Sequence, residues 1–109
     1  MALVIARRFE VFIVGLEPTR GAEMKKIRPC VVVSPEPMNR HLQTVLVAPL
    51  TSAARRYPSR VPCKFEGLTG EVALDQLRSV DRSRLGRSLG FMSESEGRAI
   101  ALTLQEMFA

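Results

Sequence analysis

The sequence predicts a mainly β fold in which a small, strongly bent sheet or partly open barrel precedes one C-terminal α-helix. Short β-branched and aromatic stretches follow one another at close spacing from Glu10 onward. Helical periodicity replaces this pattern only in the tail, after Ser93. A chain of 109 residues is long enough for one hydrophobic core but not two, so we expect residues 1–109 to form a single domain.

The first two predicted strands are separated by a long loop. Glu10–Leu16, with the sequence EVFIVGL, is β-branched and aromatic and forms the first strand. The following EPTRGAEMKKI combines Pro18, Gly21 and several charges, which is typical of a loop. The second strand covers residues 28–34, and its apolar run 30–33 lacks polar alternation, which indicates burial on both faces.

Arg28 begins this second strand and directly precedes Pro29. Proline is tolerated at the first residue of a strand, and it pushes the preceding residue into extended geometry. We therefore expect Arg28 to have a fixed backbone at the edge of the core. Its guanidinium faces either a groove or a structural ion pair with Asp75 or Glu23.

Three more strands are predicted over residues 44–49, 61–65 and 71–80. The segment SPEPMN closes the second strand, a basic loop LTSAARRYPSR follows the third, and EGLTG has turn composition. The stretch DRSRLGRSLGFM holds a further turn and a short last strand. The tail is predicted to be one amphipathic helix, in which Ser93 and Glu96 fit a capping box.

The charge and the rare residue types narrow the functional classes. The net charge of +5 and the sequence pI near 10.0 favour a polyanionic partner, usually nucleic acid or an acidic protein. Cys30, Cys63 and the single His41 match no disulfide framework or metal-ligand spacing, so we expect no metal site and no cofactor. The chain has no signal-peptide pattern and no apolar run of membrane length, so we expect a cytoplasmic protein without a membrane partner.

No familiar catalytic motif occurs, and the candidate site consists of polar residues at strand ends and in loops. Arg28 begins the second strand, Thr51 and Ser52 follow the third, and Asp75 and Gln76 interrupt the fifth. The two long loops add further charged candidates, which are Arg20, Glu23, Lys25, Lys26, Arg55 and Arg56.

Each candidate also has a purely structural explanation. Thr51 and Ser52 fit turn positions, and Arg55 and Arg56 fit a solvated loop face. Asp75 is harder to explain in this way, because a carboxylate within an apolar strand is rare unless it is paired or faces solvent.

These motifs, in this order, resemble the MazF/PemK (Kid) endoribonuclease toxins of toxin–antitoxin pairs. The matching segments are EPTRGAEMKKIRPCVVVSP, VLVAPLTS, RYPSRVP and EVALDQLRSVD, and the resemblance runs from about Arg8 to Phe108. It implies an SH3-like compact β-barrel of the CcdB/PemK-like type, with short helices and a C-terminal α-helix. It also implies a homodimer that cuts single-stranded RNA at short sequences without metal and is neutralised by a cognate antitoxin.

The resemblance implies a role for each matched residue. Arg28 of the RP motif is the main catalytic residue, and Thr51 matches the threonine after the third-strand proline. Glu23 matches the acid of the first loop and Asp75 the acid of the DQ motif, which is catalytic in Kid-like members and mainly structural in others. The implied RNA-binding residues are Arg20, Lys25, Lys26, Ser52, Arg55, Arg56 and Gln76.

These residue types suit attack by a ribose 2′-OH on the adjacent phosphorus, which leaves a 2′,3′-cyclic phosphate and a 5′-OH. A fixed guanidinium at Arg28 meets the charge that develops on the phosphoryl oxygens. Arginine is a poor general base because it stays protonated. Glu23 or Asp75 takes the proton, and the sequence leaves both open.

The first strand departs from the family pattern. Phe9 stands where the family usually has glycine, and Gly15 and Glu17 replace the usual aspartates.

The alternative function is a non-catalytic binding module of the same fold, either a CcdB-like gyrase inhibitor or a silent RNA-binding member. CcdB-type toxins resemble one another around a C-terminal tryptophan, whereas this chain has no Trp and ends LQEMFA.

Overall fold

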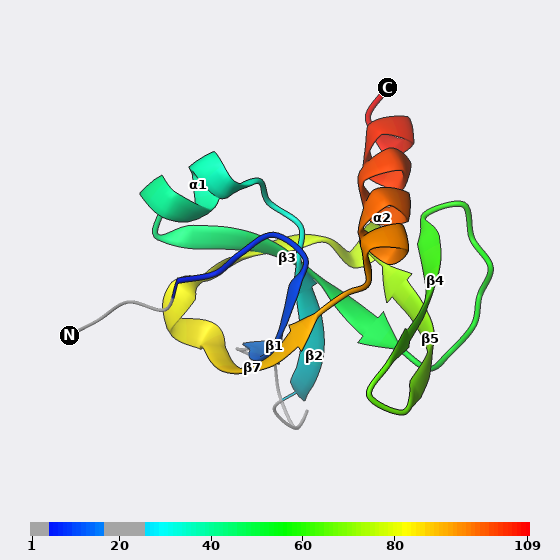
Figure 1. Cartoon of the computed structure of the whole chain (residues 1–109), viewed down its shortest axis with the longest axis horizontal. Helices are drawn as coiled ribbons and strands as arrows, with labels where there is room; N and C mark the ends of the chain where they lie inside the picture. The colour runs from blue at the N-terminus through cyan, green and yellow to red at the C-terminus, as the bar shows by residue number, and fades with distance from the viewer. Residues whose placement is uncertain (1–4, 17–25) are drawn as a thin grey trace, which may run out of the picture.

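The computed structural model describes residues 5–16 and 26–109. Within these residues, seven strands form one antiparallel sheet in the order β4-β5-β3-β2-β1-β7, with β6 also paired to β3. The sheet curls into a half-barrel, and the C-terminal helix α2 (Glu94–Met107) packs beside β4 (Figure 1). The predicted mainly β fold with a C-terminal helix is therefore confirmed. The strands are β1 (Glu10–Leu16), β2 (Lys26–Val32), β3 (Thr44–Thr51), β4 (Arg60–Phe65), β5 (Leu68–Ala73), β6 (Arg78–Asp81) and β7 (Leu85–Phe91).

β1 has its predicted bounds, whereas β2 begins and ends two residues earlier than predicted. Arg28 is therefore the third residue of β2 rather than the first, and Pro29 lies inside the strand. Pro29 pairs with Ile13 of β1, but the pairing of β2 with β3 starts only at Cys30. β3 thus leaves the edge of β2 open at the proline, which has no N–H to donate.

The predicted single strand over residues 71–80 is wrong, because the chain forms two strands there. A 3-10 turn, η1 (Leu74–Gln76), separates β5 from β6. Both strands pair with the same edge of β3, β6 along its first half and β5 at Leu50 and Thr51. The chain turns at η1 so that it can leave one part of this edge and join the other. The predicted turn EGLTG is also shorter than expected, because β5 already begins at Leu68.

Alternating side chains of β2 and β3 build an apolar cluster on each face of the sheet. The helix-side cluster joins Val31 of β2 to Ile100 of α2. The far-side cluster joins Cys30 of β2 to Val47 of β3. Residues 30–33 are all buried, which confirms the prediction that this run is covered on both faces.

The two α-helices begin in different ways. α2 begins with the predicted capping box, since the Ser93 hydroxyl accepts the Glu96 N–H and the Glu96 carboxylate accepts the Ser93 N–H. α1 (Glu36–His41) was not predicted at this place and lies where only the end of the second strand was expected. The buried Asn39 anchors α1, because its amide donates to the Ser34 carbonyl at 2.8 Å. Within residues 5–16 and 26–109, no helix is both long and apolar enough to cross a membrane.

Candidate functional site

Arg28 and Thr51 lie on one face of the sheet, near the ends of adjacent strands. Cys30 of β2 is paired with Pro49 of β3, and Arg28 and Thr51 each lie two residues beyond this pair at the same end of the sheet, where β3 has left β2. Side chains alternate along each strand, so both residues share the face of Cys30 and the far-side cluster. Arg28 is half-buried, and no described acidic residue forms an ion pair with it.

A second guanidinium, that of Arg78, lies on this face. Arg78 opens β6 and pairs with Val47 of β3, which belongs to the far-side cluster. Burial raises the pKa of the Cys30 thiol to about 12, and the charges of Arg28 and Arg78 act on it in the opposite direction. Both guanidiniums therefore lie near one buried thiol, and no carboxylate of the described residues pairs with either of them. Cationic groups that share a face and have no carboxylate partner among the described residues favour the binding of an anion to that face.

The Thr51 hydroxyl accepts one hydrogen bond within the protein and donates none to the described residues. Its Oγ1 accepts a hydrogen bond from the Ala53 N–H at 3.1 Å, which begins the loop over residues 52–59. Thr51 therefore has the hydrogen bond of a turn residue, in agreement with its purely structural explanation. A hydroxyl that accepts with one lone pair can still donate its proton, so Thr51 can hydrogen-bond a phosphate as well. Ser52, the next residue, is exposed.

Asp75 is the partner of Arg60 and not of Arg28. Arg60 donates from Nε to Asp75 Oδ1 at 2.6 Å and from Nη2 to Oδ2 at 3.2 Å, and the Ser59 hydroxyl donates to Oδ1 at 3.0 Å. The alternative in which Asp75 pairs with Arg28 is therefore wrong. The hydrogen bonds from the Arg60 guanidinium hold the pKa of Asp75 below its usual range. A carboxylate with a lowered pKa is a weaker proton acceptor, which favours a positioning role for Asp75. Gln76 is exposed beside it.

Glu71 is a buried carboxylate that was not predicted as a site residue. It pairs with Thr51 across β5 and β3, so its side chain emerges on the same face, where it is 6% exposed. Its Oε1 accepts the Arg55 N–H at 3.0 Å and its Oε2 accepts the Arg56 N–H at 3.1 Å. Arg60 Nη1 lies 3.5 Å from Oε1. The backbone donors, with Arg55 first, and the Arg60 guanidinium hold the pKa of Glu71 below its usual range, so the carboxylate is charged at neutral pH.

The 52–59 loop presents two of the predicted RNA-binding cations to solvent. Arg55 and Arg56 are both exposed, whereas their backbone N–H groups point inward to Glu71. Arg56 has a φ of 58°, in the left-handed region. Successive N–H groups around such a residue form a concave nest that binds an anion. Glu71 fills this nest from within the protein.

The remaining predicted residues come from the segment that the sequence predicts to be the first loop. Arg20, Glu23 and Lys25 lie outside the residues that the structure describes. Lys26 is the first residue of β2, and its side chain is likewise outside the description.

Three residues of the site, Arg60, Glu71 and Arg78, escaped prediction. The sequence did contain a signal for Glu71 and Arg78, because they are charged residues near the two ends of the apolar stretch around Asp75. What was missing was the pairing of β3 with β5 and β6, which determines the face on which each charge emerges.

The fold and the site together define a small curled β-sheet protein with a threonine and two arginines at the ends of its strands, the arginines forming no ion pair with the described residues. The chain belongs to the PemK-like, MazF-like toxin family of type II toxin–antitoxin systems, whose family model matches residues 7–108. This confirms the family predicted from the sequence motifs.

Named relatives support this placement. Endoribonuclease MazF of Staphylococcus epidermidis is 30% identical over 98 residues, which cover 83% of this chain and 80% of that protein. A solved MazE–MazF complex from Deinococcus radiodurans (form II) has 26% identity and a TM-score of 0.81 and covers 96% of both chains. A mycobacterial endoribonuclease in complex with its cognate antitoxin has 26% identity and a TM-score of 0.78, over 94% of this chain and 93% of that one.

Proposed function

We propose that this protein is an endoribonuclease toxin that cleaves single-stranded RNA at short sequences without a metal ion. The observation that carries the proposal is the placement of Arg28 and Arg78 on the face of Thr51, with no carboxylate of the described residues paired to either guanidinium. Such a surface suits a phosphodiester, since guanidinium groups bind phosphate oxygens with charge-assisted hydrogen bonds. The names of the curated relatives agree with this activity.

In the proposed reaction the ribose 2′-oxygen bonds to the adjacent phosphorus while the bond from phosphorus to the 5′-oxygen breaks. The products are a 2′,3′-cyclic phosphate and a 5′-OH, the departing oxygen taking a proton from water. Arg28 and Arg78 neutralise the charge that grows on the non-bridging oxygens, and the Thr51 O–H donates to one of them. No protein group has to change its charge to give this stabilisation.

We assign the removal of the 2′-OH proton to Glu23 rather than to Asp75. Both Asp75 oxygens already accept hydrogen bonds, and its pKa is lowered by Arg60. An efficient general base has a pKa nearer the working pH. A Glu23→Gln variant that kept the wild-type pH–rate profile would overturn this assignment.

The proposal includes two protein partners. The Deinococcus and mycobacterial neighbours were solved with antitoxins, and an acidic, partly disordered antitoxin segment suits a protein with a net charge of +5. We also propose a homodimer, since twofold symmetry is the commonest assembly and Leu102 and Phe108 leave apolar surface exposed. Sedimentation as a monomer at micromolar concentration would reject the dimer. We also propose a cytoplasmic location, because the proposed RNA substrate is found in the cytoplasm.

The direct test is to incubate the purified protein with a long RNA in EDTA and to sequence the new 5′ ends. We expect cuts at one short recurring sequence, each leaving a 5′-OH, and cutting slower by about 10²–10³-fold with Arg28→Ala. RNA that is bound but stays intact across many sequences, with and without magnesium, would favour the non-catalytic binding module instead.

A further inference from the structure

The 52–59 loop is held to the sheet by three side chains of the candidate site. The Thr51 hydroxyl accepts the Ala53 N–H at its start. The Glu71 carboxylate accepts two N–H groups in its middle. Asp75 holds its end through Ser59 and the adjoining Arg60. The loop and the site are therefore one hydrogen-bonded unit.

Glu71 is the anchor with the most specific geometry. Its two oxygens each take one of two successive peptide N–H groups, at 3.0 and 3.1 Å, and its side chain is only 6% exposed. The left-handed backbone at Arg56, with a φ of 58°, is unfavourable for a side-chain-bearing residue and persists only when its surroundings fix it. Glu71 supplies that constraint and thereby sets the direction in which the two arginine side chains leave the loop.

The charge of Glu71 is compensated within the protein. Besides the two N–H groups, Arg60 Nη1 lies 3.5 Å from Oε1, and the same guanidinium binds Asp75 and lies over the Tyr57 ring, with Cζ 5.1 Å from its centroid. A carboxylate satisfied in this way repels an approaching polyanion little. Glu71 can therefore organise a cationic surface from beneath.

We propose that Glu71 is a positioning residue for RNA binding, which fixes the 52–59 loop so that Arg55 and Arg56 meet the phosphate backbone of the substrate. This inference rests on the proposed function. Glu71 touches no reacting atom, so its loss weakens binding and leaves the chemical step nearly unchanged.

The test compares Glu71→Gln with the matched variant Glu66→Gln, which removes the same charge from an exposed residue of the neighbouring turn. Glutamine has the same shape, but its amide NH₂ cannot accept the second N–H. We expect the KM for RNA to rise about tenfold, as for loss of a charge-assisted hydrogen bond, with kcat within about twofold. The log–log salt slope of binding should become shallower by about 0.7 to 1.4, since each of the two arginines that loses its phosphate contact removes about 0.7. Glu66→Gln should match wild type in all three quantities.

A double-mutant cycle separates positioning from general destabilisation. Replacing Arg55 and Arg56 by alanine should raise the KM in the wild-type background but add little in the Glu71→Gln background, because the effects share one cause. Full additivity, or a KM and salt slope equal to those of Glu66→Gln, would overturn the inference. If Glu71→Gln does not fold, Glu71→Asp replaces it in the test. This variant keeps the charge on a side chain that is one methylene shorter, and it should also raise the KM and make the salt slope shallower. A wild-type protein that neither binds nor cuts RNA contradicts the proposed function, whereas an active wild type with an unaffected Glu71→Gln variant contradicts this inference alone.

Discussion

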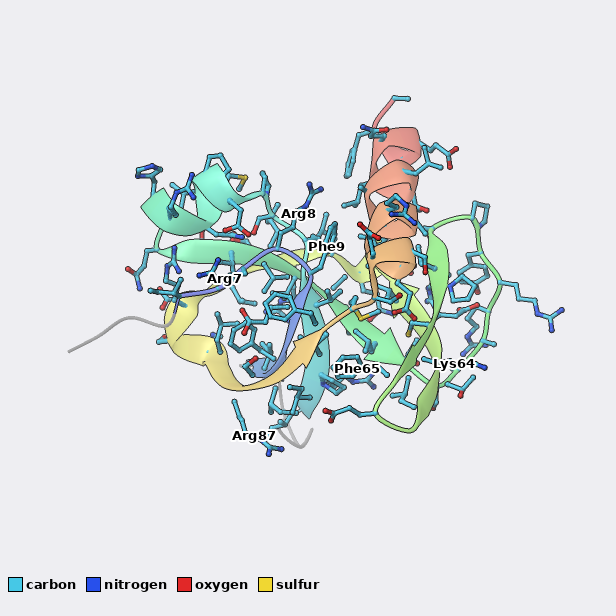
Figure 2. The ribbon with its side chains drawn as sticks, in the orientation of Figure 1. Arg7, Arg8, Phe9, Lys64, Phe65 and Arg87 are labelled. Carbon is cyan, nitrogen blue, oxygen red and sulfur yellow. The ribbon has the colours of Figure 1, made fainter. Side chains whose placement is uncertain are left out.

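The ring of Phe9 lies so close to Gly97 of α2 that a Cβ at position 97 would stand 2.8 Å from Phe9 Cδ2. Phe9 has a φ of 70°, which residues other than glycine rarely adopt. Its N–H donates to the Val32 carbonyl at 2.6 Å, and its carbonyl accepts the Met92 N–H at 3.0 Å. Arg8 covers the ring, with Cζ 4.8 Å from the centroid, and both residues precede β1 on the side of α2 (Figure 2). The residue that departs from the family's glycine thus ties the start of β1 to the helix.

We expect Gly97→Ala to destabilise the fold, although alanine is the better helix former. Alanine gains about 1 kcal/mol over glycine inside a helix, whereas overpacking against the Phe9 ring costs about 1–3 kcal/mol. Urea denaturation measures the net change. In a Phe9→Gly background the ring is absent, so Gly97→Ala should stabilise the protein there. Destabilisation by the same amount in both backgrounds would show that the contact between Phe9 and residue 97 does not affect the free energy of unfolding.

The parts of the fold that follow from local pattern were predictable, and the parts that depend on distant pairing were not. The bounds of β1 and the capping box at Ser93 depend on neighbouring residues and were predicted correctly. The break at η1 depends on how β3 shares one edge between two strands, which no local pattern reveals. The contact between Gly97 and Phe9 also depends on distant pairing, because Phe9 lies at the other end of the chain.

The same distinction applies to the candidate site. Arg28 and Thr51, which their motifs had singled out, each lie two residues beyond the Cys30–Pro49 pair and on one face of the sheet. The partner of Asp75 is Arg60, a residue of the neighbouring strand that was not predicted as a site residue, although it stands in the RYPSRVP segment. Charge complementarity alone allowed several pairings for Asp75, and only the strand order selects one of them.

Arg28→Ala should keep the fold and lose cleavage. Removal of one preorganised donor to the developing charge typically costs about 10²–10³ in rate. Arg28 makes no ion pair with a described residue, so its loss leaves no buried acid of this part of the chain without a partner. Single-turnover cleavage and a thermal melt measure the two effects. The matched control is Arg40→Ala, an exposed arginine of α1, which should cleave at the wild-type rate. An Arg28→Ala protein that cleaves normally or does not fold would remove Arg28 from the centre of the site.

Arg78→Ala should lower the cleavage rate by about tenfold or more if it binds the same phosphate as Arg28. Because both guanidiniums would act on one transition state, the double variant should be less impaired than the product of the single effects predicts. Cleavage rates of the four proteins give the coupling directly. Purely multiplicative effects would place the two arginines on separate phosphates.

Thr51→Ala and Thr51→Ser should behave differently. Alanine removes both the donor to the phosphate and the acceptor of the Ala53 N–H, so we expect cleavage to fall strongly. Binding of RNA should change little, because backbone contacts by exposed cations dominate affinity. Serine keeps the hydroxyl and should retain most of the rate. Equal losses in both variants would indicate that the methyl group, and not the hydroxyl, is what the site requires.

Acid should remove the contribution of the Asp75–Arg60 pair to stability. Arg60 lowers the pKa of Asp75 from its ordinary value of 3.8. A carboxylate whose pKa is lower in the folded than in the unfolded protein stabilises the fold above the unfolded pKa, and this stabilisation is lost as the pH falls through the folded value. We therefore expect Asp75→Asn to lower the Tm at pH 7, by about 4 °C because solvent screens the partly exposed carboxylate.

The difference in Tm between wild type and Asp75→Asn should stay constant from pH 7 to about 5 and shrink as the pH falls below about 4. Asparagine cannot titrate, so only the wild-type protein loses the contribution in this range. The matched control is Glu94→Gln, whose partner Arg98 lies on the exposed surface of α2, with side chains 88% and 68% exposed. This control should shift the Tm little at any pH, since exposed helix pairs contribute little. A difference for Asp75→Asn that persists unchanged to pH 3 would mean that the amide disturbs packing around Arg60, and that the ionic pair does not hold the end of the 52–59 loop.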